Sequence, residues 1–381
     1  MAVYLCLTVI TCVLALFVNN RDYVQLHKKC PMSKVQRFDG TGNTFGGRTR
    51  QQSVNLLIAF AVFALLAGVS ACRIAVGNDY WVYRFQFNLI MQGRHVSYEW
   101  GFNLVVWLIQ SLFGYDNYLP VFAVFSVATA FFMVKALYDQ AEWFAFSVFL
   151  LMTGGYYFSS LNSVRYYFVL AILMYATKFA LRKEYWKFIL WICFGACFHK
   201  SILVVLPIYI GARWLSEKKI PKLFYGLGGM FVASLLLFPD VYRRIIFFFY
   251  PFYENSAFDV VDISYTNIAK CVGVLVLSLL YYKGTIKDNV VNRFYFLLNL
   301  GGLALYTFAN FIPEISRIGY YLIVTQIFFI PSMLIRIENK KQRIFFSACV
   351  ALAFAGYFAL FLRSAYDVNV RLLPYLNWIF N

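Results

Sequence analysis

IFFSACVALAFAGYFALF, residues 344–361, is an unbroken apolar run without a single charged residue, and it follows directly after Lys340, Lys341 and Arg343. As a helix it would be about 27 Å long, close to the hydrocarbon thickness of a bilayer. Runs of this kind recur along the chain, which is 62% hydrophobic and 13% charged, with a mean hydropathy of +0.66. The composition predicts an all-α integral membrane protein, with residues 1–381 forming a single polytopic domain.

The distribution of basic residues predicts the orientation of the chain. Six proposed cytoplasmic segments hold 23 of the 34 Lys and Arg, whereas the 17 acidic residues divide into eight inside and nine outside. An excess of Lys and Arg alone is the signature of cytoplasmic loops. We therefore predict an outer N-terminus and about 12 transmembrane helices (11–14). The proposed spans are 2–19, 53–72, 117–137, 142–159, 164–181, 185–199, 200–216, 223–239, 266–282, 292–312, 318–335 and 344–361.

Three connecting segments are longer than ordinary turns. Residues 20–52 are predicted to form a basic cytoplasmic loop, and residues 73–114 and 239–265 two outer loops. Within the first outer loop, residues 101–113 are apolar but too few to cross about 30 Å of hydrocarbon. We expect them to form a short re-entrant or interfacial helix.

The formal net charge of +17 does not indicate a nucleic-acid partner, because the basic residues are scattered through short loops without an aromatic-interleaved patch. Cys193 and Cys197 lie four residues apart near His199. Small residues in helix packing account for these cysteines better than a set of metal ligands does. With no phosphate-binding loop or paired-histidine motif in the chain, we predict no metal and no cofactor.

Polar breaks on the predicted outer side carry the candidate catalytic groups. Asp79 stands beside Tyr80, and an ionised carboxylate there can take a proton from a sugar hydroxyl while the ring packs against the sugar. The alternative is that Asp79 caps a short surface helix, and Glu99 is open to the same two interpretations. His199 can exchange protons near neutral pH, with Lys200 beside it to bind phosphate. Its alternative role is a structural hydrogen bond at a helix end.

Two arginines, Arg165 and Arg317, are expected in the first turns of helices, where the helix dipole opposes a cation. Guanidinium groups bind phosphate oxygens bidentately, so two of them suit a diphosphate. The residues before Arg165, Asn162 or Ser163, can cap its helix. The alternative for each arginine is a pair within the protein, such as Arg317 with Glu314. Asp79, Glu99, Arg165, His199 and Arg317 are together predicted to form one extracytoplasmic site.

The order of these motifs resembles that of the EpsG family of bacterial exopolysaccharide proteins, which belong with the Wzy-type polymerases. The matching segments are Arg73 with Gly77-Asn78-Asp79-Tyr80, Glu99 with Gly101-Phe102, Arg165, His199-Lys200-Ser201, and Glu314 with Ser316-Arg317. The resemblance covers roughly residues 53–335. Tyr166 departs from the family pattern, where a glutamine is expected, so no role is carried over to that position.

The resemblance implies a GT-C-like polytopic enzyme of the bacterial cytoplasmic membrane with its active site on the outer side. Its substrates would be undecaprenyl-diphosphate-linked oligosaccharides, its product an exopolysaccharide or capsule, and its partners membrane lipids, a flippase and a chain-length regulator. The base would be Asp79, His199 or Glu99. Diphosphate would be bound by Arg165, Arg317, Arg73 and Lys200, and sugar by Tyr80, Tyr320 and Glu314.

Two other classes of membrane protein remain open. A transporter or flippase of lipid-linked oligosaccharides would have a similar number of spans, but it should show charges at the bilayer midplane and halves related by a repeat. The proposed spans are nearly free of charge, and no repeat is visible. A membrane acyltransferase could use His199 as its base, but it would have no evident need for several outer arginines.

Overall fold

Helices form where the chain is continuously apolar, as expected of segments whose backbone groups must be satisfied internally. The computed structural model describes residues 1–19, 44–45, 48–217, 222–249, 251, 254, 263–312, 314–368 and 370–379. A helix, or a run of helices interrupted by a turn, lies over each proposed span. Among the described residues, 5 helices are long and apolar enough to cross a membrane: Arg50–Ala71, Leu119–Gln140, Val164–Leu181, Ile315–Ile335 and Lys340–Ser364. The helical, membrane-type architecture agrees with the prediction, whereas the number of crossings and the GT-C-like arrangement stay predictions.

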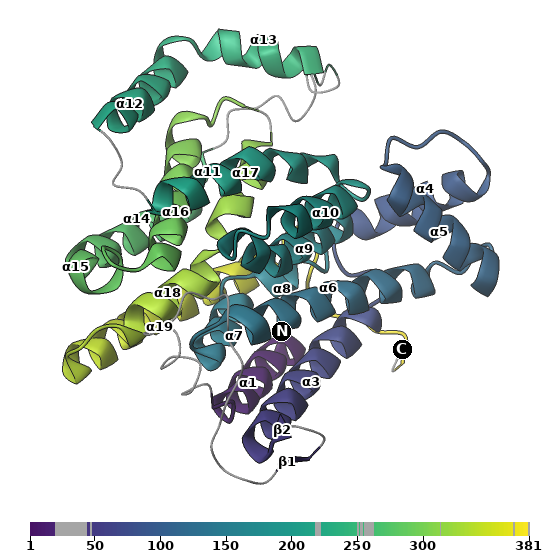
Figure 1. The fold of residues 1–381 in the computed structure, drawn as a ribbon. Helices are drawn as coiled ribbons and strands as arrows, with labels where there is room; N and C mark the ends of the chain where they lie inside the picture. The colour runs from purple at the N-terminus through teal and green to yellow at the C-terminus, as the bar shows by residue number, and fades with distance from the viewer. Residues whose placement is uncertain are drawn as a thin grey trace. The chain divides into compact units, whose positions relative to one another are not determined.

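The chain divides into two units, Met1–Leu203 with Glu338–Asn381, and Val204–Ile337. In the first unit, α6 lies between α3 and α9, and α1 packs against α3 and α7 (Figure 1). Its elements are α1 (Ala2–Leu16), β1 (Thr44–Phe45), β2 (Arg48–Thr49), α3 (Arg50–Ala71), α4 (Asp79–Met91), α5 (Trp100–Phe113), α6 (Leu119–Gln140), α7 (Phe144–Thr153), α8 (Tyr156–Ser159), α9 (Val164–Leu181), α10 (Tyr185–Ala196), η2 (Lys200–Val204, a 3-10 helix) and α19 (Lys340–Ser364).

In the second unit, α16 packs against α11, α14, α17 and α18. Its elements are α11 (Val205–Glu217), α12 (Lys222–Leu237), α13 (Pro239–Phe249), α14 (Tyr265–Leu280), α15 (Tyr282–Thr285), α16 (Val290–Phe308), α17 (Ile315–Ile323) and α18 (Gln326–Ile335). Buried amides join its helices: Gln326 on α18 donates to the Asn299 side chain on α16 at 2.8 Å, and Asn299 donates to the Cys271 carbonyl on α14 at 3.1 Å. Such bonds fasten helices together where water is absent.

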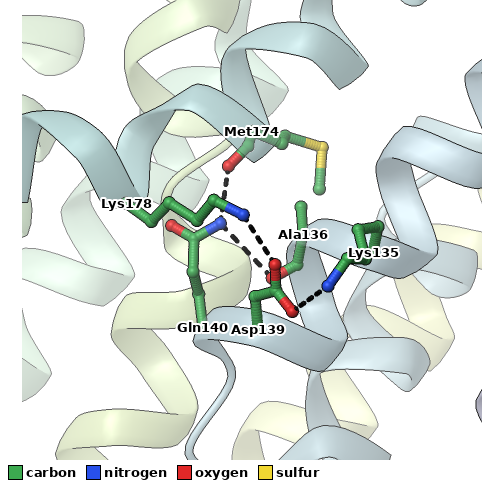
Figure 2. Close-up of polar contacts among 6 residues, drawn as sticks. All are labelled: Lys135, Ala136, Asp139, Gln140, Met174 and Lys178. Atoms are coloured by element: carbon green, nitrogen blue, oxygen red, sulfur yellow. Dashed lines mark hydrogen bonds and ion pairs between the residues drawn. The ribbon is translucent and has the colours of Figure 1, made fainter. Parts of the chain in front are cut away.

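An ion-pair cluster joins the C-terminal ends of α6 and α9 (Figure 2). Asp139 accepts from Lys178 at 2.7 Å and from Lys135 at 2.5 Å, and the Gln140 amide donates to the Met174 carbonyl at 2.8 Å. The Lys178 side chain is only 8% exposed, and its charge near the end of α9 suits the helix dipole. The cluster lies about 20 Å along α9 from the first turn of that helix, so it fixes the helix pair at the end away from Arg165.

The connecting segments differ in part from the sequence-based expectation. The predicted helix over residues 101–113 is present as α5, and the loop before it contains a second helix, α4. This is the short helix considered as the alternative for Asp79, although Asp79 is its first residue and makes no side-chain cap bond. Most of the predicted loop 20–52 lies outside the described residues, and β1 and β2, an antiparallel pair, belong to the described part. In the predicted outer loop 239–265, α13 occupies the first part, and most of the remainder lies outside the described residues.

Candidate active site

The N-terminus of α9 brings together two of the predicted outer segments. Ser163 is the N-cap residue of α9, yet neither it nor Asn162 caps that helix with its side chain. Instead, the Ser163 hydroxyl donates to Asp79 Oδ2 at 2.8 Å, and Asn162 Oδ1 accepts from the Asp79 backbone N–H at 2.9 Å. Ser163 therefore holds the predicted N-cap position, but its side chain and that of Asn162 bind the start of α4 and not the first N–H groups of α9.

Asp79 is the first residue of α4 and is partly exposed. A carboxylate in this position is stabilised by the positive end of the helix dipole. Within the part of the chain that the structure describes, Oδ1 accepts no hydrogen bond, whereas Oδ2 is held by Ser163. Asp79 therefore combines a fixed orientation with one oxygen that can accept a proton.

Gly77 allows the Asp79 loop to approach α9 this closely. Its φ of +93° is disfavoured for other residues, and a Cβ there would lie 2.8 Å from Asn162 Cα and 2.9 Å from the Leu161 carbonyl oxygen. Both neighbours are backbone atoms that have little room to move. The glycine of the Gly77-Asn78-Asp79-Tyr80 motif is thus required for the hydrogen bonds that position Asp79.

Arg165 forms the second half of the site through an ion pair with Glu99. Its Nη1 lies 2.5 Å from Glu99 Oε2, and the two side chains are only 16% and 15% exposed. The other Glu99 oxygen accepts from the Lys200 backbone N–H at 3.0 Å. Glu99 therefore connects the start of α9 to the start of η2, with both of its oxygens bonded.

The Arg165 guanidinium also lies over the Tyr98 ring, with 3.6 Å between Cζ and the ring centroid. Burial raises the pKa of Tyr98 to about 12, so the ring stays neutral and presents its electron-rich face to the cation. Arg165 Nε is buried without a hydrogen-bond partner among the described residues. Glu99 thus holds one edge of the Arg165 guanidinium and Tyr98 covers one face, while the Nε–H donor is unused among the described residues.

His199 lies at the turn between α10 and η2, next to the residue whose N–H binds Glu99. Its Nδ1 is 2.8 Å from the Ser201 hydroxyl, and its ring meets Tyr166 edge to face at 5.8 Å between centroids. The Lys200 side chain is exposed. Within the first unit, Asp79 is thus bonded to Ser163, Arg165 to Glu99, and Glu99 to the residue after His199. That these groups act together as one site stays a prediction.

Gly101 fixes the approach of α5 to this turn. Its N–H donates to the Cys197 carbonyl at 3.0 Å, and a Cβ there would lie 2.8 Å from both that oxygen and Cys197 Cβ. We predict that Gly101→Ala destabilises the protein by about 1–3 kcal/mol through overpacking. Gly68→Ala is the matched control, because a Cβ at this α3 glycine meets nothing within 4 Å. Thermal unfolding in detergent measures the effect; equal midpoints for the two variants would contradict it.

Arg73 and Tyr80, predicted to bind substrate, are both 1% exposed. Arg73 Nη1 donates to the Ser70 carbonyl and to the Ser126 hydroxyl, each at 2.6 Å. Burial lowers the pKa of Arg73. The Tyr80 ring stacks on Phe122 with 4.6 Å between centroids. Binding of diphosphate or sugar by these two side chains would require them to become exposed, so their predicted roles are not favoured by this conformation.

The remaining predicted residues belong to the second unit. Arg317 Nε lies 2.9 Å from Glu314 Oε2 on the first turn of α17, which is the internal pair considered as an alternative. The Arg317 side chain is nevertheless 37% exposed. Tyr320 packs beside Cys271, Tyr306 and Ile323. Arg317 therefore keeps an accessible guanidinium, whereas much of the Tyr320 ring is engaged in packing.

Sequence analysis missed Tyr98 and the bond from Ser163 to Asp79. Tyr98 precedes Glu99 as an aromatic residue beside an acid, the same pairing that drew attention to Asp79 and Tyr80, so that signal could have identified it. The Ser163 bond joins positions 84 residues apart, and no local pattern indicates it.

Comparison with known proteins gives one match that covers most of the chain. The model of the EpsG family matches residues 56–377, which include every predicted site residue. The match extends the sequence resemblance beyond residue 335 to the C-terminal segment. Neither the curated proteins nor the solved structures contain a match to this chain.

Proposed function

Because this chain belongs to the EpsG family, which implies a polysaccharide-polymerase-like function, we propose that it polymerises lipid-linked oligosaccharides on the outer face of the bacterial cytoplasmic membrane. The substrate is a repeat unit carried on undecaprenyl diphosphate. The growing chain is transferred from one carrier to the non-reducing end of the next unit, and the first carrier diphosphate is released. The product is an exopolysaccharide or capsule.

The observation that carries this proposal is the pairing of an acid and a cation by one short segment of the chain. Ser163 holds Asp79, and Arg165, two residues later, is held by Glu99 over Tyr98. Displacement at an anomeric carbon needs a base for the acceptor and positive charge for the departing diphosphate. Asp79, at the start of α4, supplies the base, and Arg165, in the first turn of α9, supplies the cation; Ser163 binds Asp79 at this end of α9.

The proposed reaction is one displacement. The acceptor hydroxyl oxygen forms a bond to the anomeric carbon of the growing chain, and Asp79 Oδ1 takes the proton of that hydroxyl. The bond from the anomeric carbon to the diphosphate oxygen breaks, and its electron pair leaves with the diphosphate. Arg165 donates hydrogen bonds to the charge that develops there.

Asp79 is preferred as the base over the two other candidates. Both Glu99 oxygens already accept hydrogen bonds, so neither is open to the proton of an acceptor hydroxyl. One His199 ring nitrogen is bonded to Ser201, which suits either a base or a positioning group. We assign Glu99 to the orientation of Arg165 and keep His199 as the second candidate base.

In the first unit, the exposed Lys200 side chain is proposed as an additional cation for the diphosphate. Taken by itself, Arg317 of the second unit has an accessible guanidinium and is proposed as a diphosphate ligand. Glu314 and Tyr320 are proposed to contact sugar. Flippase and chain-length regulator partners remain part of the proposal, since an outer polymerase needs its substrate delivered and its product length controlled.

Reconstitution of the purified chain in vesicles with a lipid-linked oligosaccharide tests the function. A polymerase converts the single unit into a ladder of longer products. Translocation without a change in size would instead identify a transporter, and transfer of an acyl group would identify an acyltransferase. Either of the last two results, without a ladder, would overturn the proposal.

Labelling of single cysteines tests the proposed orientation. In a cysteine-depleted chain, cysteines at Asn78, Asn162 and Glu314 should react with an impermeant thiol reagent added outside, because all three lie on the outer side. Cysteines at Lys183 and Lys340 should react only after the membrane is permeabilised, and they serve as the inside controls. Labelling of the Asn162 position only after permeabilisation would contradict a shared outer site.

A further inference from the structure

Residues 370–378, near the end of the described chain, run beside the loop that leads to Asp79; we call this segment the C-terminal strap. Arg73 and Asn377 form an antiparallel bridge, flanked by bonds from the Ile74 N–H to the Leu376 carbonyl at 3.0 Å and from the Trp378 N–H to the Cys72 carbonyl at 3.1 Å. Regular pairing of this kind fixes the register between the two segments.

The strap also binds the two residues immediately before Asp79. The Gly77 N–H donates to the Arg371 carbonyl at 2.8 Å, and the Asn78 N–H donates to the Val370 carbonyl at 3.1 Å. Gly77 also packs closely against the backbone of Asn162, on the segment before α9. The turn before α4 is therefore held both by the strap and by the segment that carries Ser163.

Two tyrosine side chains, Tyr4 and Tyr375, anchor the strap to the helices around it. The Tyr4 hydroxyl of α1 donates to the Leu372 carbonyl, and the Tyr375 hydroxyl donates to the Val69 carbonyl at the end of α3, each at 2.8 Å. Leu372 and Leu373 are themselves buried. The strap is thus hydrogen-bonded at several points and packed at Leu372 and Leu373, whereas Leu376 and Trp378 are exposed.

We propose that the C-terminal strap is a positioning element for Asp79. Undocking it removes the acceptors of the Ile74, Gly77 and Asn78 amides and frees the loop that sets the direction of α4. No strap residue is bonded to Glu99 or Arg165 among the described residues, so the cation half of the site is independent of it. This inference rests on the proposed function only where it assigns a catalytic consequence to the strap.

The expected effect is therefore a loss of turnover with little change in substrate affinity. A displacement of about 1 Å at a reacting group costs about 100-fold in rate. Removal of residues 368–381 should lower kcat by about that factor and leave KM within about threefold. The matched control lacks only residues 379–381, beyond the strap, and should retain its activity.

A milder variant guards against misfolding of the truncated chain. Tyr4→Phe combined with Tyr375→Phe removes only the two anchoring hydroxyls, and we expect about a tenfold lower kcat.

Trp378→Cys, added to this double variant, places a thiol opposite Cys72, at the separation of about 5.5 Å between Cα atoms that a disulfide accepts. In a chain whose other cysteines are replaced, oxidation should restore turnover of the double variant, and reduction should remove it again. A merely structural role for the hydroxyls would not respond to this bond.

Hydrogen exchange tests whether the strap is docked, independently of whether the protein is a polymerase. The amides of Ile74, Gly77 and Asn78 should be protected in the full chain and should exchange at least tenfold faster in the truncated one, whatever reaction the protein catalyses. Unchanged exchange rates of these amides in the truncated chain would show that the strap does not hold this loop. Faster exchange with full turnover, or equal turnover of the oxidised and reduced forms, would overturn its positioning role. An inactive wild-type chain would count against the proposed function, and the exchange result would still decide docking.

Discussion

Replacing Asp79 with asparagine should abolish chain extension while single lipid-linked units still bind. Asparagine preserves the shape of the side chain, and its oxygen can still accept from Ser163, but it cannot take the proton of the acceptor hydroxyl. Loss of a general base costs about 10²–10⁴ in rate. Initial rates and the ladder of products in reconstituted vesicles measure the loss, and binding of a labelled lipid-linked unit measures the retained affinity.

Asp116→Asn is the matched control for this prediction, because Asp116 is an exposed acid in the short connection between α5 and α6. It should leave the ladder unchanged. Ser163→Ala should give a smaller loss than Asp79→Asn, since the base remains and only its orientation is relaxed.

Near-normal polymer from Asp79→Asn would eliminate Asp79 as the base and move the assignment to His199 or Glu99. His199→Gln then becomes decisive: loss of the polymer would identify the imidazole, whereas residual activity with an unshifted pH profile would indicate a positioning role.

The sequence predicts helices best where polar residues interrupt an apolar run. The predicted span 164–181 coincides with α9 because Asn162 and Ser163 precede it and basic residues follow Leu181. By contrast, α4 was predicted only as the alternative interpretation of Asp79, because Asp79, Arg84 and other polar residues lower its hydropathy. Its buried aromatic residues Tyr80, Tyr83 and Phe87 nevertheless follow helical spacing, and this periodicity could have revealed it.

The sequence indicated candidate residues for a site but not the contacts among them. Charges in polar breaks at the membrane boundary pointed to Asp79, Glu99, Arg165 and His199. Whether such a group faces the site depends on tertiary packing. Arg73 follows α3 as an apparent boundary cation, yet it turns inward because Ser70 and Ser126 accept its hydrogen bonds. The bond between Ser163 and Asp79 likewise depends on the close approach that Gly77 permits, which a single sequence does not encode locally.

Arg165→Lys should lower the rate of polymerisation at least 100-fold, and Arg317→Lys should also impair it strongly. Lysine keeps the charge but has no planar fork, so it cannot bind Glu99, cover Tyr98 and still present donors to a diphosphate in the way Arg165 does. A 100-fold loss corresponds to about 2.7 kcal/mol of transition-state stabilisation. Polymer synthesis by membranes that contain equal amounts of each variant provides the measurement, and the amount of protein in the membrane should stay normal.

Arg84→Lys separates a stacking effect from a catalytic one. Arg84 lies over the Tyr118 ring at 4.5 Å, but it is exposed and forms no carboxylate pair among the described residues, so its lysine variant should remain active. The Arg165 and Arg317 variants differ in what a null result would mean. Full activity of Arg317→Lys alone would reduce that residue to the partner of Glu314 seen on α17. Full activity of Arg165→Lys as well would mean that both arginines only balance charge within the protein. The diphosphate would then need other cations, and one candidate is Lys200, whose backbone N–H binds Glu99.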